Sequence, residues 1–167
     1  MKPVRRVVTG HDAQGRSIFF MDSGIPDVFG GGGMDDFRDQ GALALAELWA
    51  TGLPADNSGN KDLRRPGEYA LEPSPGQMML RIAEFPPEPK GLAKPGKGLE
   101  SHPGFHKTDT VDFIIVLEGE VYSMMETGET LLKTGDVLIQ RGTNHAWSNR
   151  SGKVCKIAAV MLNARTL

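Results

Sequence analysis

The chain has 167 residues, of which 39% are hydrophobic and 24% are charged, and its formal net charge is −2. This length suits one domain with a buried core, and the slight negative charge gives no basic surface on which a nucleic acid would bind. No segment approaches the roughly 20 consecutive apolar residues that span a bilayer. We therefore expect neither a nucleic acid nor a membrane as a partner.

Two features of the sequence predict the cellular compartment. The amino-terminal MKPVRRVVTG is not followed by an apolar run, so we expect no secretory signal. The single cysteine, Cys155, has no partner for an internal disulfide, and the surrounding VCKIAAVML predicts a buried strand position. Both features predict a protein of the reducing cytoplasm.

The amino-terminal part of the chain contains short candidate strands. Residues 4–9 (VRRVVT) and 17–21 (SIFFM) predict two strands around a turn at residues 12–15. The four glycines at residues 30–33 are followed by MDDFRDQ, which lacks the lysine and the serine or threonine of a phosphate-binding loop. We therefore expect a mobile surface loop at these glycines.

The next segments lead into a more regular pattern. Residues 42–50 (ALALAELWA) fit either a short helix or a strand, and residues 51–75 predict a long polar connection. Residues 77–85 (QMMLRIAEF) predict a strand that stops at two prolines, before an exposed loop rich in lysine, glycine and proline. Alternation along this strand places four side chains on one face, namely Met78, Leu80, Ile82 and Glu84. We expect Glu84, at the end of the strand, to form an ion pair.

From residue 106 to residue 162 short apolar strands follow one another closely. Glycine-containing turns separate them at Glu118-Gly119, Thr127-Gly128, Thr134-Gly135, Arg141-Gly142 and Ser151-Gly152. This regular spacing predicts an antiparallel sandwich or barrel. The turns leave no room for the crossover helices of a parallel sheet.

Two segments of this region carry polar residues at distinctive spacing. The first runs from His106 through Asp112 to Gly119, and the second runs from Gly135 through His145 to Asn149. In this order and spacing they resemble the two motifs of the cupin superfamily, HxHxxxE with a glycine after six residues, and a glycine followed by PxG and HxxxN. The resemblance covers roughly residues 77–162 and implies a small single-domain cupin with a degenerate metal motif.

The resemblance also implies the fold and its division. We expect an all-β chain in which residues 76–167 form the cupin double-stranded β-barrel, or jelly roll. Residues 1–75 would be an N-terminal extension of short strands and loops that packs on the barrel or on a partner subunit. Because uncovered strand edges favour pairing between copies, and because cupins commonly pair in this way, we expect a homodimer.

In metal-binding cupins, two histidines and a glutamate of the first motif and the histidine of the second hold one divalent ion. The resemblance therefore implies that His106, Asp112 and His145 are the metal ligands and catalytic residues, with Fe, Mn, Ni or Zn as the ion. Two departures weaken the motif, since Thr108 replaces the second histidine and Asp112 replaces the glutamate. Gln140 stands where the family usually has proline. An aspartate reaches roughly 1.5 Å less far than a glutamate, against a tolerance near 0.2 Å.

Each of these residues also has a purely structural interpretation, and the sequence leaves both open. His106 fits a solvent-facing loop position, Asp112 fits a strand end where a carboxylate caps free backbone N–H groups, and His145 fits a residue that satisfies a buried carbonyl. The same groups beside Trp147 predict a small-molecule pocket at the barrel mouth. Its further lining residues would be Thr108, Gln140 and, if the preceding loop folds inward, His102.

Two functions fit this pattern. The first is an enzyme acting on a small molecule, of the metal-dependent oxygenase, decarboxylase or isomerase type, or a metal-free enzyme in which the histidines transfer protons. The alternative is a metal-free barrel that binds a small ligand without catalysis. The sequence does not decide between an enzyme and a binding protein.

Overall fold

The computed structural model describes residues 1, 4–25, 28–30, 43–68, 70–89 and 102–165. The described residues form eleven strands and no helix, which confirms the predicted all-β class. The strands are β1 (Arg5–His11), β2 (Ser17–Gly24), β3 (Val28–Gly30), β4 (Ala44–Gly52), β5 (Gln77–Phe85), β6 (Thr110–Glu118), β7 (Glu120–Met125), β8 (Gly128–Lys133), β9 (Val137–Arg141), β10 (His145–Ser148) and β11 (Cys155–Asn163). Within these ranges there is accordingly no helix long and apolar enough to cross a membrane.

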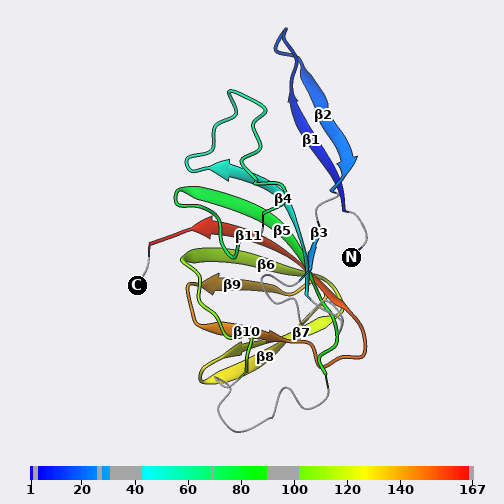
Figure 1. The fold of residues 1–167 in the computed structure, drawn as a ribbon, viewed down its shortest axis with the longest axis vertical. Helices are drawn as coiled ribbons and strands as arrows, with labels where there is room; N and C mark the ends of the chain where they lie inside the picture. The colour runs from blue at the N-terminus through cyan, green and yellow to red at the C-terminus, as the bar shows by residue number, and fades with distance from the viewer. Residues whose placement is uncertain (2–3, 26–27, 31–42, 69, 90–101, 166–167) are drawn as a thin grey trace.

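The barrel is built from two antiparallel sheets. The larger has six strands in the order β3-β4-β5-β11-β6-β9, and the smaller has three in the order β10-β7-β8. Figure 1 shows the smaller sheet packed beneath the β9 end of the larger, curved one. Some strands that are neighbours in a sheet are far apart in sequence, such as β5 and β11. This is the predicted jelly-roll connectivity.

Alternation along the strands places an apolar core between the sheets. In β11, Cys155, Ile157, Ala159 and Met161 are buried, whereas the intervening residues are only partly covered. They pack with residues of both sheets: Leu45, Ala83, Ile114, Val116, Val121 and Leu132. Cys155 is fully buried, as predicted, and burial raises the pKa of its thiol to about 11.

Strand β4 resolves the ambiguity at residues 42–50 in favour of a strand. It pairs with β5 over eight residues, so the large sheet includes residues from both sides of position 76. The connection from residue 53 to residue 76 contains no strand among its described residues, as predicted. Glu84 forms the expected ion pair, with its carboxylate 2.9 Å from Lys156 Nζ. The glycines 31–33 lie outside the described residues.

Strands β1 and β2 form a separate hairpin that projects from the barrel (Figure 1). The predicted turn at residues 12–15 joins them, with Gly15 in the left-handed region at φ 75°. Arg6 fixes the hairpin to the body, because its guanidinium lies 2.7 Å from both the Leu48 carbonyl and the Asp62 carboxylate. The hairpin therefore adds a surface to the molecule without contributing to the barrel core.

A buried ion pair lies on the interior face of the large sheet. Arg81 of β5 and Glu47 of β4 are cross-strand neighbours, their charged atoms are 2.8 Å apart, and both side chains are no more than 6% exposed. Arg81 also donates to the carbonyls of Ala70 and Leu71. The arginine thus holds the connection between β4 and β5 against the barrel interior.

We predict that Glu47→Gln lowers the free energy of unfolding by about 3 kcal/mol, because the substitution leaves a buried guanidinium without its countercharge. The matched control is Asp22→Asn, since Asp22 pairs with Arg5 in an exposed ion pair. The control should cost much less, because solvent screens an exposed ion pair. Urea denaturation of both variants measures the difference, and equal losses would contradict this role for the Glu47–Arg81 pair.

Candidate functional site

The structure brings His106 and His145 together at one end of the barrel. The two residues form an isolated antiparallel bridge, with reciprocal backbone hydrogen bonds of 2.9 Å. Because residues in such a bridge present their side chains on the same face, the imidazole rings lie together with centroids 4.3 Å apart. The two motif histidines predicted from the sequence are therefore neighbours in space.

Backbone carbonyls fix the proton positions on both imidazoles. His106 Nδ1 is 2.8 Å from the Gly104 carbonyl, and His145 Nδ1 is 2.8 Å from the Thr143 carbonyl. A carbonyl oxygen only accepts, so in each neutral ring Nδ1 carries the proton and Nε2 keeps its lone pair. A histidine that binds a metal through Nε2 is usually oriented in this way.

The two histidines differ in their exposure to solvent. His145 is 3% exposed, whereas His106 is only half-buried. Burial and the neighbouring His106 lower the pKa of His145 to about 4, although the hydrogen bond to Thr143 opposes this shift. His145 is therefore a neutral imidazole at pH 7, which is the form that binds a metal or accepts a proton.

Asp112 lies on the interior face of β6 and is 4% exposed. Burial raises the pKa of its carboxyl, while Thr110 and the charges of Arg81 and His106 lower it. Its Oδ1 finds no hydrogen-bond partner among the described residues. Asp112 is thus a desolvated carboxyl group with one free acceptor atom.

Gln140 of β9 is directly opposite Asp112 in the strand pairing and is 1% exposed. Its Nε2 donates to the carbonyl and to the hydroxyl of Thr143. Its Oε1, like Asp112 Oδ1, has no partner in the described part of the chain. The hydroxyl of Thr108 is engaged with that of Thr110, at 2.8 Å.

Aromatic side chains border the histidines on the side of the apolar core. Trp147 meets the His145 ring edge-on, with centroids 6.0 Å apart, and Phe85 lies 5.7 Å from Trp147 on its other side. Trp147 follows His145 by two residues on β10, so both point into the barrel. Both rings pack against the apolar core, which therefore extends to the His145 imidazole.

The structure places His102 away from this group. Its Nε2 is 3.0 Å from a Glu88 oxygen, and the other Glu88 oxygen accepts a 2.9 Å hydrogen bond from Ser148. Ser148 follows Trp147 on β10, so its side chain points to the opposite, outer face of the small sheet. His102 therefore anchors the loop before His106 through Glu88.

The three ligands implied by the motif are not assembled into one cluster. Among the described residues, no three side chains of His, Cys, Asp or Glu lie close enough together to hold one ion. The two histidines are in contact and Asp112 is near enough for its pKa to respond to His106. An ion at this end of the barrel would thus need Asp112 to move or an additional ligand.

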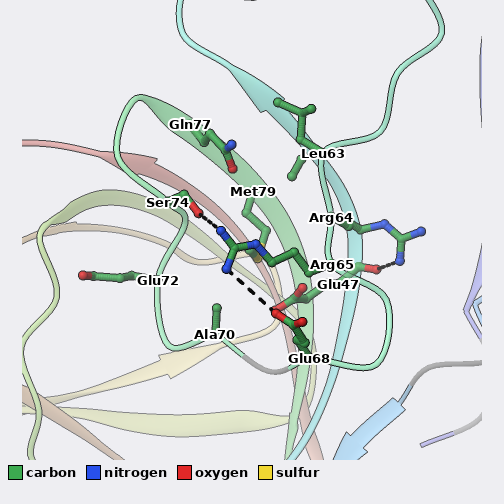
Figure 2. A pocket seen from close by; sticks show the side chains of 11 residues that line it. Glu47, Leu63, Arg64, Arg65, Glu68, Ala70, Glu72, Ser74, Gln77 and Met79 are labelled. Atoms are coloured by element: carbon green, nitrogen blue, oxygen red, sulfur yellow. Dashed lines mark hydrogen bonds and ion pairs between the residues drawn. The ribbon is translucent and has the colours of Figure 1, made fainter.

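A pocket of about 70 Å³ lies beside the interior ion pair (Figure 2). It is lined by Glu47, Ala50, Leu63, Arg64, Arg65, Glu68, Ala70, Glu72, Ser74, Gln77 and Met79. Figure 2 shows Arg65 extending across it between Ser74 and Glu68. These contacts are loose, at 3.4 Å and 3.8 Å, so Arg65 is a weakly held cation at the pocket.

The sequence does not predict this pocket, because the polar, turn-rich residues 51–75 indicate only a long connection. The pocket is nevertheless linked to the predicted site through Glu72, whose carboxylate accepts a 2.6 Å hydrogen bond from the Asp109 backbone N–H. The charge of Glu72 also contributes to the raised pKa of Asp112. The feature of the sequence that could have indicated the pocket is the pair of adjacent arginines, Arg64 and Arg65, within this connection.

Comparisons with known proteins agree with this architecture. A family model described as the cupin domain matches residues 92–161. Phomopsin biosynthesis cluster protein C′ of Diaporthe leptostromiformis is 34% identical over 161 residues, which cover 90% of this chain and 73% of that protein. The cupin-domain-containing oxidoreductase fogC of Aspergillus ruber is 28% identical over 155 residues, covering 89% of this chain and 66% of that protein.

Among solved structures, a Cupin 2 conserved barrel domain protein from Salinispora arenicola is similar, with a TM-score of 0.45 and 16% identity, over 77% of this chain and 82% of that one. The family model and the relative at 34% identity carry the assignment, and the two motifs occur in the order and spacing of the family. The chain belongs to the cupin superfamily.

Proposed function

We propose that the protein is a small-molecule enzyme that uses one divalent metal ion held by His106, His145 and Asp112. The observation that carries the proposal is the contact between the two imidazoles, each of which bonds through Nδ1 to a backbone carbonyl and so keeps the lone pair of Nε2 available. Two neutral imidazoles and a carboxylate suit Fe(II), Mn(II), Ni(II) or Zn(II) with open positions for a substrate.

The free acceptor on Asp112 supports the same proposal. A buried carboxyl oxygen without a hydrogen-bond donor costs free energy, and a cation placed beside it would offset that cost. Because an aspartate is short and the three groups are not preassembled, binding requires a small inward movement of Asp112 or of the His106 segment. The half-buried position of His106 leaves room for such a movement.

A metal ion at this position would supply a Lewis acid that polarises a bound oxygen or carbonyl group. His106 and His145 would fix the geometry, and the Trp147–Phe85 wall would exclude water from the inner side of the site. The relatives named as oxidoreductases favour oxidation of a small organic substrate, ahead of decarboxylation or isomerisation. A free, buried cysteine supports a cytoplasmic location.

The alternative function is a metal-free barrel that binds a small ligand without turnover. The pocket beside Arg65 favours it, because this pocket is formed without any metal and offers a guanidinium that a carboxylate could engage. A ligand bound there would lie next to the Glu47–Arg81 pair. Thermal stabilisation by small carboxylic acids, lost in Arg65→Gln, would support this alternative.

We also propose a homodimer, in which residues 1–75 extend the 76–167 barrel by adding β3 and β4 to its large sheet and a hairpin to its surface. The outer face of β6 and β9 carries an apolar patch of cross-strand neighbours that are 39–59% exposed, namely Phe113, Ile115, Leu117, Val137 and Ile139. The projecting hairpin presents further exposed apolar side chains, with Phe19 78% exposed. Because one chain carries both sets of exposed apolar side chains, a second copy can cover them.

The metal proposal predicts that protein purified without an affinity tag contains close to one equivalent of Fe, Mn, Ni or Zn. His106→Ala and His145→Ala should each lower this content at least tenfold, because each removes one imidazole ligand. Elemental analysis by mass spectrometry measures the content. His11→Ala is the matched control, since His11 lies in β1 on the projecting hairpin.

Two outcomes would contradict the metal proposal. Protein that contains no metal and remains empty when offered all four ions would exclude a metal-dependent enzyme and leave the ligand-binding barrel. A metal content that His11→Ala reduces as strongly as His145→Ala would place the ion outside the barrel.

The low pKa of His145 predicts how stability depends on pH in the metal-free protein. Above pH 6.5 the imidazole is neutral in the folded and unfolded states. Between pH 6.5 and about 4 the unfolded chain binds a proton that the folded protein excludes, so the free energy of unfolding falls as the pH is lowered. The total effect is about 3 kcal/mol. Urea denaturation in EDTA should show this decrease in the wild type and a flatter profile in His145→Gln, and parallel profiles would contradict a neutral His145.

The dimer proposal predicts that Ile139→Lys converts the protein to a monomer, because it places a charge in the apolar patch. Sedimentation velocity at micromolar concentration measures the oligomeric state. Leu71→Lys is the control, since Leu71 is 43% exposed but lies in the connection between β4 and β5. A wild-type protein that sediments as a monomer would refute the homodimer.

A further inference from the structure

Gln140 is a polar side chain that is only 1% exposed, and the cupin motif does not account for it. Its amide occupies the position at which the family usually has proline. The Thr143 carbonyl accepts a hydrogen bond from Gln140 Nε2 at 3.3 Å and one from His145 Nδ1 at 2.8 Å. One backbone oxygen therefore orients both an amide and an imidazole.

The Thr143 carbonyl determines which atoms of Gln140 and His145 remain available to a ligand. Because a carbonyl oxygen only accepts, the nitrogen of the Gln140 amide must face Thr143, and Oε1 must face the other way. By the same argument His145 keeps a lone pair on Nε2. Gly142, with a φ of 56°, forms the turn that brings the Thr143 carbonyl to this position.

The atoms left free are acceptors without donors. Gln140 Oε1 and Asp112 Oδ1 are both buried, have no partner among the described residues, and belong to residues directly opposite each other on β9 and β6. Buried acceptors on two paired residues are unfavourable unless a donor or a cation satisfies them. The described residues supply no donor to either atom, and a cation bound to both would satisfy them.

We propose that Gln140 Oε1 is an additional oxygen ligand of the divalent ion, in place of the histidine that Thr108 replaces. This inference rests on the proposed function, because it assumes that an ion binds near His145. It explains how an ion can be held although no three His, Cys, Asp or Glu side chains form a cluster among the described residues. The set of donors would be two imidazole nitrogens, a carboxylate oxygen and an amide oxygen, a mixture that suits Fe(II), Mn(II) or Zn(II).

The test is titration of the metal-free protein with Co(II), followed by calorimetry and by the visible absorption of the bound ion. Gln140→Met keeps the length and approximate volume of the side chain and removes the oxygen, together with the Nε2 that donates to Thr143. We expect it to raise the Kd for Co(II) at least tenfold and to change the absorption spectrum, because the ion loses a ligand. Gln14→Met is the control, since Gln14 lies in the exposed turn between β1 and β2, and it should change neither quantity.

Gln140→Glu is the second variant, and it decides the matter if Gln140→Met does not fold. A carboxylate in place of the amide adds a negative charge at the same oxygen, so the folded variant should bind Co(II) more tightly than the wild type. If both Gln140 variants bind Co(II) with unchanged affinity while His145→Ala abolishes binding, Gln140 is not a ligand, and the metal-dependent function still stands. A wild-type protein that binds no Co(II) would overturn this inference together with the metal-dependent function.

Discussion

The desolvation of polar side chains inside the barrel is the constraint on which the rest of the structure depends. The interior of the large sheet carries a glutamate, an arginine, an aspartate and a glutamine, where a simple barrel would have apolar residues. Each group is either compensated by a specific partner or left with a free atom. Arg81 is paired with Glu47, whereas among the described residues Asp112 Oδ1 and Gln140 Oε1 have no partner. The structure thus separates a paired polar region from one with unpaired acceptors.

The connection between β4 and β5 makes this separation possible. Its backbone carbonyls at Ala70 and Leu71 accept from Arg81, and Glu72 accepts from the backbone that leads into β6. A loop in contact with solvent on one side and a buried charge on the other can satisfy polar groups that a strand cannot. The pocket beside Arg65 follows from the same arrangement, because the loop bridges over the sheet edge instead of packing flat on it.

Much of the fold could be predicted from the sequence, because short strands with glycine turns have few alternative packings. The site was predictable to the extent that the motif spacing placed His106 and His145 at the same end of the barrel, and the bridge between them confirms this. The sequence left strand β4 ambiguous, because ALALAELWA fits both a helix and a strand. Its pairing with β5 shows that it is a strand. The bond between His102 and Glu88 could not be predicted, since the two residues are distant in sequence.

The anchoring of both imidazoles by main-chain oxygens affects how the protein can change during evolution. Neither Gly104 nor Thr143 uses its side chain to orient a histidine, so substitutions at position 143 that keep the turn leave the lone pair of His145 in place. The geometry of the two rings is encoded in the path of the backbone and not in neighbouring side chains. Related barrels could therefore diverge widely around these histidines, acquiring new substrates, while the paired imidazoles keep the same arrangement.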